Sequence, residues 1–237
     1  VDTLKSLADR VASLGVERFV LDDGWFKGRR GDYAGLGDWT VDYAIYPDGL
    51  SPLINHVNSL GMEFGIWFEP EMVNPDSDLY RTHPDWVLHT EGNEQLRFRN
   101  QLVLDLTRPQ VVNYLFKCID DILSEYSSIR YIKWDMNRDI NHAGNEHGKP
   151  AVSKQTHALY KLIDDLREAH PEVEIESCSS GGARVDYGVL SHTDRVWTSD
   201  SNDAIDRLDI QRGCSYFFPS EVMGAHVGPR DCHITGR

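Results

Sequence analysis

The run Lys133-Trp134-Asp135-Met136-Asn137-Arg138 carries an ammonium and a carboxylate two residues apart, straight after the apolar residues Ile129 to Ile132. If this segment forms a strand, side chains two positions apart share a face, so Lys133 and Asp135 point into the same space. A cation beside a carboxylate keeps it ionised, and such a group at a strand end can act as a nucleophile or an electrostatic stabiliser. An ion pair that merely closes the strand is an equal alternative for this segment taken alone.

Acids and tryptophans also follow the other apolar runs of the chain. These runs end in the segments Leu21 to Trp25, Trp67 to Glu71, Trp134 to Asp135, Glu176 to Cys178 and Trp197 to Asp200. Tryptophan rings stack on the C–H faces of sugars, carboxylates accept hydrogen bonds from hydroxyls, and a pair of acids can cleave a glycosidic bond. Asp22 and Asp23 are then interpreted as hydroxyl acceptors, although adjacent carboxylates also suit a hard cation or a capped turn. The shared pattern indicates a sugar site lined by carboxyl groups.

Cleavage needs a second acid that can hold a proton, and such a carboxyl group requires an apolar or crowded setting. Asp200 fits best, because it follows a strand that ends in tryptophan and lies about two strand-helix units after Asp135. Three other acids compete less well. Asp194 begins the strand, whereas Asp203 and Asp206 lie at or inside the start of the next helix, where capping is the usual role.

The elements that must position these residues alternate between short β-rich runs and helical patterns, which is typical of a parallel sheet with crossover helices. Strands are expected at Arg18 to Asp22, Glu63 to Phe68, Arg130 to Trp134, Val173 to Ser177, Asp194 to Trp197 and Glu221 to Ala225. Helices are expected at Val1 to Val16, Ser51 to Leu60, Pro109 to Tyr126, Ser153 to His170 and Ala204 to Phe217, with loop or edge structure at Leu102 to Leu106. In a (β/α)8 TIM barrel the carboxyl ends of the strands form one rim, so the strand endings predict a single acidic, aromatic cup.

Six strands do not close a barrel that needs eight, so the predicted fold class is α/β, an incomplete (β/α)8 TIM barrel whose first and last strands are missing. No linker or composition shift divides the chain, and residues 1–237 are expected to form a single barrel domain. The polar stretch Asn74 to Asn100 is expected to be an active-site loop. Because an open barrel exposes strand edges, missing flanks or close neighbours are expected to cover them.

The composition excludes several kinds of partner. The 237 residues include 24 Lys and Arg against 38 Asp and Glu, a formal net charge of -14, which argues against nucleic acid and anionic membrane surfaces as partners. No two of the four cysteines show paired spacing, so a zinc or redox motif is not supported and a reducing, cytoplasmic location is expected. The first residues have an amphipathic helix pattern, and neither a signal peptide nor a membrane span is expected.

Six blocks of the chain resemble, in order, the signature blocks of the glycoside hydrolase family 36 α-galactosidases, particularly the bacterial ones. They are Leu21 to Phe26, Trp67 to Met72, Arg99 to Asp105, Lys133 to Arg138, Cys178 to Gly182 and Trp197 to Ala204. The resemblance implies a retaining hydrolase that releases terminal non-reducing α-D-galactose from melibiose and raffinose-type oligosaccharides, with no metal or organic cofactor. It also implies that Asp135 is the nucleophile and Asp200 the general acid and base, with carboxyl groups about 5 to 5.5 Å apart. The residues that it assigns to galactose binding are Asp22, Asp23, Trp67, Arg99, Lys133, Asn137, Cys178 and Gly181.

The chain departs from the family pattern at Phe98, where glycine is commoner, and at Ala183 to Asp186, which replaces a Gly-Arg-Phe-Asp run. Both changes concern the pocket wall and remove no catalytic group. The N-terminal β-sandwich and the C-terminal β domain of the family are absent from residues 1–237.

Three alternatives stay open. One is a galactosyl transglycosylase of the raffinose-synthase kind, and another is a non-catalytic galactoside-binding fragment. The third is a metal-dependent barrel hydrolase with Asp22, Asp23 and Asp135 as ligands. Whether the full-length protein is a homo-oligomer is also left open.

Overall fold

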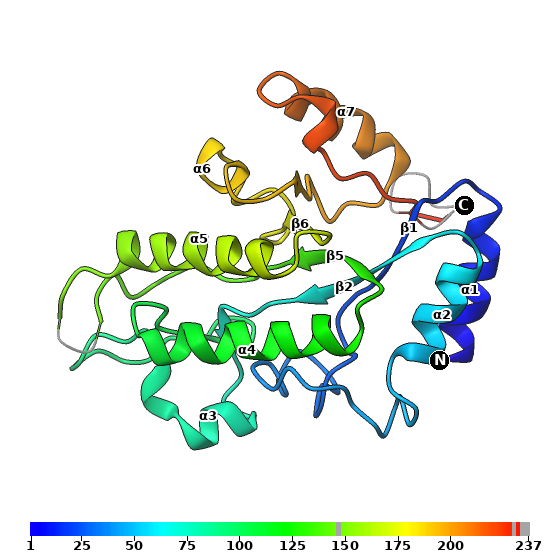
Figure 1. Ribbon diagram of the computed structural model, residues 1–237. Coiled ribbons are helices and arrows are strands. Elements are labelled where there is room, and N and C mark those ends of the chain that lie inside the picture. Colours follow the sequence, from blue (N-terminus) through cyan, green and yellow to red (C-terminus); the bar gives the residue numbers. More distant parts are fainter. Residues whose placement is uncertain (146–147, 229–230, 233–237) are drawn as a thin grey trace.

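The computed structural model describes residues 1–145, 148–228 and 231–232, and it is built around one parallel sheet (Figure 1). The strands of this sheet are β1 (Arg18–Leu21), β2 (Glu63–Phe68), β5 (Ile129–Trp134), β6 (Glu174–Ser177) and β7 (Arg195–Val196). They lie in the order β1-β2-β5-β6-β7, and every neighbouring pair is parallel. The predicted parallel α/β architecture is confirmed.

The strand order is that of a barrel rather than of a doubly wound sheet. Each new strand is added at the same edge, and the order never reverses as it does in a Rossmann-type sheet. Right-handed crossovers that always advance in one direction place their helices on one outer face. The inner face and the carboxyl ends of the strands are left to form a site, as they do in a (β/α) barrel.

The sixth predicted strand, Glu221 to Ala225, is reduced to a single bridge. Its first residues belong to the 3₁₀ turn η2 (Ser220–Val222), and Met223 forms an isolated parallel bridge with Val196. The Gly224 N–H donates to the Val196 carbonyl oxygen at 2.7 Å. Because the 3₁₀ turn includes Glu221 and Val222, too few extended residues remain to form a series of hydrogen bonds with β7. The prediction of a full strand was therefore wrong. The segment still occupies the sixth position, beside β7.

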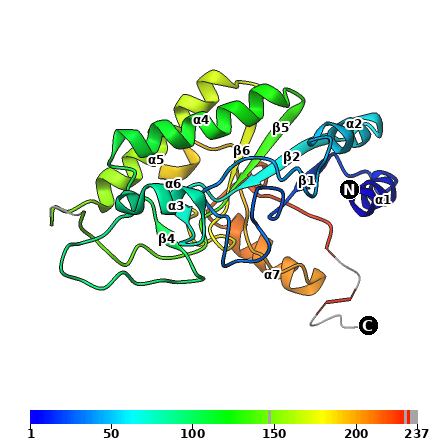
Figure 2. The same ribbon diagram turned by 90° about the horizontal axis from the view of Figure 1, so that it is seen from below.

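The long helices within the described residues agree with the predicted ones to within about one turn. They are α1 (Asp2–Ala12), α2 (Ser51–Ser59), α4 (Pro109–Glu125), α5 (Val152–Ala169) and α7 (Ala204–Ser215). In both ribbon views α4 and α5 run side by side, as do α1 and α2 (Figures 1 and 2). None of the described helices is both long and apolar enough to cross a membrane.

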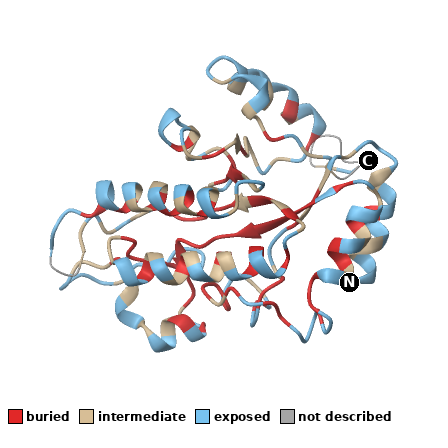
Figure 3. Cartoon of the chain, in the orientation of Figure 1, coloured by how far each residue is buried: buried red, intermediate tan, exposed pale blue. Residues whose placement is uncertain are grey.

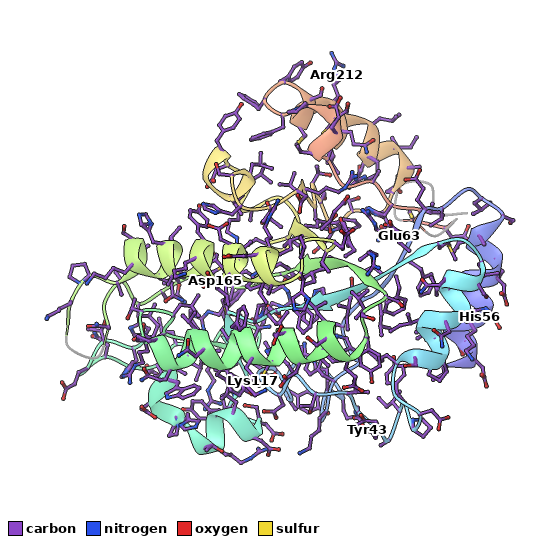
Figure 4. The ribbon with its side chains drawn as sticks, in the orientation of Figure 1. Tyr43, His56, Glu63, Lys117, Asp165 and Arg212 are labelled. Atoms are coloured by element: carbon purple, nitrogen blue, oxygen red, sulfur yellow. The ribbon has the colours of Figure 1, made fainter. Side chains whose placement is uncertain are left out.

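The helices that cover the sheet turn an apolar face inward. On α4 the buried positions recur at the helical period and comprise Val111, Leu115, Ile119, Ile122 and Leu123. The outer faces carry ion pairs four residues apart, between Lys117 and Asp121 on α4 and between Lys161 and Asp165 on α5. Figure 4 labels one member of each pair, Lys117 and Asp165. Figure 3 shows the outcome, with buried strands and helices that are buried on one side.

The stretch Asn74 to Asn100 carries more regular structure than a loop. Strands β3 (Met72–Val73) and β4 (Leu102–Val103) flank it and pair antiparallel, which agrees with the edge structure expected after residue 101. Within it lie α3 (Asp78–Thr82) and the 3₁₀ turn η1 (Pro84–Trp86), and a further short helix, α6 (Tyr187–Leu190), follows β6. From this stretch Arg99 lines the central cavity.

Candidate active site

A cavity of about 940 Å³ runs along the inner face of the sheet. Its lining includes eight of the ten predicted site residues, namely Asp22, Asp23, Trp67, Arg99, Lys133, Asp135, Asn137 and Asp200. They come from β2 and β5, from the segments that follow β1, β5 and β7, and from the loop before β4. The remaining two, Cys178 and Gly181, are not among the residues that line the cavity. The barrel topology therefore brings together side chains that are far apart in the sequence.

Asp135 directly follows β5, is 6% exposed, and carries a carboxylate that accepts hydrogen bonds on both oxygens. Its backbone N–H donates to the Phe68 carbonyl oxygen at 2.7 Å, which extends the pairing of β2 and β5. Oδ2 accepts hydrogen bonds from Trp67 Nε1 at 3.0 Å and Asn137 Nδ2 at 2.7 Å, and Oδ1 accepts one from the Met136 backbone N–H at 2.8 Å. N–H donors stabilise the ionised form and fix its orientation. Asp135 thus meets the requirements of a nucleophile.

Lys133 and Asp135 face the same cavity, as their shared strand face predicts, and the Lys133 ammonium forms its salt bridge with Asp22. The Lys133 ammonium lies 2.8 Å from the Asp22 carboxylate and 4.5 Å from the centroid of the Trp197 ring. Burial opposes the charge of Lys133, but the carboxylate of Asp22, and then that of Asp135, outweigh it and raise the lysine pKa. The flexible side chain reaches from β5 across β2 to the end of β1, so its cation sits between strands instead of beside its sequence neighbour.

Asp200 lies on the segment after β7 and presents an exposed carboxylate to the cavity. That carboxylate accepts a hydrogen bond from the Trp197 indole N–H at 2.8 Å. The apolar or crowded setting predicted for Asp200 is not found within the described residues, because Asp200 stands beyond the last full strand of the sheet. Asp135 and Asp200 follow strands that β6 separates, and both face the same cavity.

The tight turn after β6 supports the backbone of Asp200. Gly181 has a φ of +88°, and a Cβ there would lie 2.9 Å from Ser199 Cα and 3.0 Å from Asp200 N. A Cβ on Gly182 would lie 2.8 Å from the Thr198 carbonyl oxygen. The two glycines therefore let this turn pack directly against the segment that carries Asp200.

Three further predicted residues line the cavity with supporting contacts of their own. Asp23 faces the buried guanidinium of Arg29, with Nε and Nη2 at 2.9 and 2.8 Å from its two carboxylate oxygens. Trp67 is 2% exposed, and its ring stacks on Phe26 with 6.2 Å between centroids. Arg99 is exposed and adopts a φ of +50°. Asp23 and Trp67 are thus held rigidly, whereas the Arg99 side chain extends from a loop.

Cys178 lies against Asp135 rather than in the cavity wall. The residue is 1% exposed, and its backbone N–H donates to the Trp134 carbonyl oxygen at 2.7 Å. Burial, and then the negative charge of Asp135, raise the pKa of the thiol. Cys178 is consequently a neutral S–H group and not a competing nucleophile.

Two of the three carboxylates proposed as metal ligands in the third alternative already face cations of the protein. Asp22 pairs with Lys133 and Asp23 pairs with Arg29. Among the described residues, no group of three or more His, Cys, Asp or Glu side chains is placed to hold a metal ion. The donor set around Asp22 and Asp23 therefore does not suit a divalent cation.

Comparison with known proteins assigns the family. The whole chain, residues 1–237, matches the family model described as Melibiase. The chain belongs to the melibiase family. An α-galactosidase of Escherichia coli is 57% identical over 236 residues, and the α-galactosidase AgaA of Geobacillus stearothermophilus is 43% identical over 241 residues. The resemblance to glycoside hydrolase family 36 is confirmed.

Solved structures agree with this membership of the melibiase family. The crystal structure of the glycoside hydrolase family 36 α-galactosidase AgaA superposes with a TM-score of 0.93 at 43% identity and covers 100% of this chain. Variants of AgaA have been solved in complex with raffinose and with stachyose, each with a TM-score of 0.92 to this chain. The chain spans about a third of these relatives, since the match covers 33% of the E. coli protein and 33% of AgaA.

Glu69 is a buried acid of this melibiase chain to which the sequence alone assigned no role. It is 1% exposed, and it accepts hydrogen bonds from the Asn137 backbone N–H at 2.6 Å and from Gln101 Nε2 at 3.0 Å. Burial, and then the charge of Asp135, raise the pKa of Glu69 to about 8. A signal was present, because Glu69 directly follows β2 just as Asp135 directly follows β5.

Glu176 is the second such acid, and it lines the cavity from β6. It is 3% exposed and accepts a hydrogen bond from the Tyr131 hydroxyl at 2.6 Å. Burial raises the pKa of Glu176 to about 7. The alternation of β6 could have indicated it, since Glu176 lies two residues before Cys178 and shares its face of the strand.

Proposed function

We propose that this chain carries the catalytic centre of a retaining α-galactosidase that releases terminal non-reducing α-D-galactose from melibiose and raffinose-type oligosaccharides. The observation that carries the proposal is the convergence of Asp135 and Asp200 on one cavity, together with the Asp22 and Lys133 pair. The α-galactosidase relatives and the raffinose and stachyose complexes of AgaA support the choice of substrate.

The proposed reaction is a double displacement. The Asp135 carboxylate attacks the anomeric carbon C1 and forms an ester bond, while the bond from C1 to the leaving oxygen breaks and that oxygen takes the proton of Asp200. Asp200 then removes a proton from water, the water oxygen attacks C1, and the ester bond to Asp135 breaks. Two inversions at C1 return the α configuration. The two carboxyl groups are expected to lie about 5 to 5.5 Å apart when substrate is bound.

The contacts of Asp135 indicate which oxygen attacks. Oδ2 accepts hydrogen bonds from both Trp67 and Asn137, whereas Oδ1 accepts one from the Met136 backbone N–H. An ionised carboxylate oxygen offers about two lone-pair sites, so Oδ1 keeps one of them for C1. We therefore assign Oδ1 as the attacking atom, with the Oδ2 contacts holding the carboxylate plane.

Galactose recognition is assigned to charged and aromatic groups around this pair of acids. The residues are Asp22, Asp23, Trp67, Arg99, Lys133, Asn137, Cys178 and Gly181. Carboxylates accept from sugar hydroxyls, the ammonium and guanidinium donate to them, and an indole face packs on C–H groups. Cys178 and Gly181 stand behind the lining, so their assignment requires the sugar to approach the wall closely.

Hydrolysis of 4-nitrophenyl α-D-galactoside by the full-length protein, followed by proton NMR, tests the function. The first product is expected to be α-galactose, which then mutarotates, and activity is expected to survive a chelator. Initial release of β-galactose would contradict retention, and loss of activity on chelation would favour the metal-dependent alternative. Product analysis with an excess of acceptor sugar separates hydrolysis from transglycosylation.

Azide separates the roles of the two acids. In Asp135→Ala, azide can attack C1 of the substrate directly, and the product expected is β-galactosyl azide. In Asp200→Ala the covalent intermediate still forms, and azide is expected to intercept it as α-galactosyl azide. Identical or exchanged products would overturn the assignment of nucleophile and general acid. Binding of galactose without any turnover would favour the non-catalytic alternative.

The proposal also includes the domain organisation, the location and the oligomeric state of the protein. Residues 1–237 are proposed to act as one barrel domain in the cytoplasm, and the unpaired spacing of the four cysteines in the sequence supports a reducing location. Assembly of identical chains also stays a prediction. Cell fractionation and light scattering of the full-length protein address the two points.

A further inference from the structure

Glu69 and Asp135 occupy neighbouring positions at the ends of paired strands. In the register of β2 and β5, Phe68 lies opposite Trp134, and the two acids are the residues that follow. Glu69 Oε1 accepts the Asn137 backbone N–H at 2.6 Å, and Asn137 Nδ2 donates to Asp135 Oδ2 at 2.7 Å. A continuous path of hydrogen bonds therefore leads from Glu69 through Asn137 to Asp135.

The surroundings of Glu69 favour its uncharged form. The hydrogen bonds that it accepts come from amide groups of Asn137 and Gln101. Those from Asn137 favour the ionised form, but burial and the charge of Asp135 have larger effects on the Glu69 pKa. The charged groups that act on it are Asp135 at the end of β5 and the exposed Arg99 from the loop before β4, and the charge of Asp135 has the larger effect on the Glu69 pKa. A buried carboxyl group beside a second carboxylate resists ionisation. Burial and Asp135 together raise the pKa of Glu69 to about 8.

Glu71 provides the contrast on the same short segment. It is buried to the same degree, at 2% exposed, but the Arg184 guanidinium lies 2.7 Å from its carboxylate and the Trp134 indole N–H donates to it at 3.0 Å. Its negative charge is compensated directly. Glu69 and Glu71 are thus equally buried but have different partners. Glu69 is linked to Asp135 through the hydrogen bonds of Asn137, whereas Glu71 is paired with Arg184.

The side chain of Gln101 is consistent with a proton on Glu69. Gln101 Nε2 lies 3.0 Å from Glu69 Oε2, while the buried Gln101 Oε1 has no hydrogen-bond partner. The two amide orientations are distinguished only by their hydrogen bonds. If the amide turns over, Oε1 takes the place of Nε2 and can accept a hydrogen bond from a protonated Glu69.

We propose that Glu69 is a positioning residue of the reaction, which in its protonated form anchors Asn137 and thereby orients the Asp135 carboxylate for attack. This inference rests on the proposed α-galactosidase function. Ionisation of Glu69 places a second negative charge next to Asp135, and the repulsion between the two carboxylates displaces Asp135 from its line of attack on C1. The rate of attack on C1 is therefore expected to fall as Glu69 loses its proton.

The test uses the pH dependence of kcat in the full-length protein with 4-nitrophenyl α-D-galactoside. The good leaving group of this substrate needs little help from the proton of Asp200, so the alkaline side of the profile reports on Glu69. Wild-type kcat is expected to fall above about pH 8, and Glu69→Gln, which imitates the protonated acid, is expected to keep its kcat there. The matched control is Glu71→Gln, which should retain the alkaline fall of the wild type.

A second variant keeps the proposal testable if Glu69→Gln folds poorly. Glu69→Asp shortens the side chain by one methylene and moves its carboxyl group away from Asn137. We therefore expect kcat to fall about 10-fold to 100-fold with little change in KM. An unchanged alkaline fall in Glu69→Gln, or wild-type kcat in Glu69→Asp, would overturn the proposal. Failure of the proposed function is distinguishable, because the wild-type protein would then not hydrolyse the substrate at any pH.

Discussion

Replacement of Gly181 by alanine should reduce catalysis by displacing Asp200. The new Cβ would lie 2.9 Å from Ser199 Cα, where ordinary van der Waals contact begins at 3.4 Å, so the segment must move by about 0.5 Å. A misplacement of about 1 Å can cost about 100-fold in rate, and half of it corresponds to about 10-fold, or about 1.4 kcal/mol in the barrier. The positive φ of Gly181 adds about 1 kcal/mol of strain, which lowers stability.

Gly61→Ala is the matched control for this substitution. Gly61 has a φ of +80°, but a Cβ there would meet nothing within 4 Å. Both variants therefore carry a similar backbone penalty in the free energy of unfolding, and Gly181→Ala alone should disturb the site. The comparison separates the loss of stability from the loss of positioning.

The assay compares a substrate with a poor leaving group, melibiose, and one with a good leaving group, 4-nitrophenyl α-D-galactoside. Displacement of a general acid affects the first substrate more, because its leaving oxygen depends on the proton of Asp200. We expect kcat/KM of Gly181→Ala to fall about 10-fold on melibiose and less on the aryl galactoside. Equal kinetics for Gly181→Ala and Gly61→Ala on both substrates would show that the turn does not position Asp200.

Three other substitutions test contacts in and around the cavity. Lys133→Met leaves the Asp22 carboxylate without its cation, so KM for galactosides should rise about 10-fold, as measured by steady-state kinetics. Arg184→Ala removes the cation next to the buried Glu71, and urea unfolding should show a loss of about 3 kcal/mol; a loss below about 1 kcal/mol would contradict the buried pair. Burial raises the pKa of Glu176 to about 7 from its ordinary 4.5, so folding binds a proton and stability falls as pH rises through this window. Glu176→Gln should reduce this fall in thermal unfolding scans and leave the part that the raised pKa of Glu69 contributes, and an unchanged pH dependence would refute the assignment.

The sequence alone identified the strands that carry the chemistry. Short β-rich runs that alternate with amphipathic helices depend on local periodicity, and local periodicity is visible along the chain. The runs around Phe68 and Trp134 were placed within a residue of the observed β2 and β5. Because parallel strands end at one rim, the convergence of Asp135 and Asp200 also followed from the pattern.

The tertiary structure decided which side chains meet. Lys133 shares a face with Asp135, yet its ammonium bonds to Asp22, which is 111 residues away in the sequence. Strand register and the reach of a flexible side chain select that partner, and neither is encoded in the spacing of Lys133 and Asp135. The donors to Asp135 likewise include the Trp67 indole, which comes from the neighbouring strand.

The sequence also could not predict how the buried glutamates are paired or that the sixth strand would be reduced to a single bridge. Glu69 and Glu71 are both glutamates two residues apart, and only their three-dimensional neighbours distinguish a protonated anchor from an ion pair. At Glu221 to Ala225 the β-rich composition was outweighed by a 3₁₀ turn, since a strand at the edge has a neighbour on one side only. The sequence by itself thus determined the family, the order of the strands and the two catalytic candidates. The partners of each charge depended on packing, because electrostatic and desolvation energies are set by distances across the sheet and not by positions along the chain.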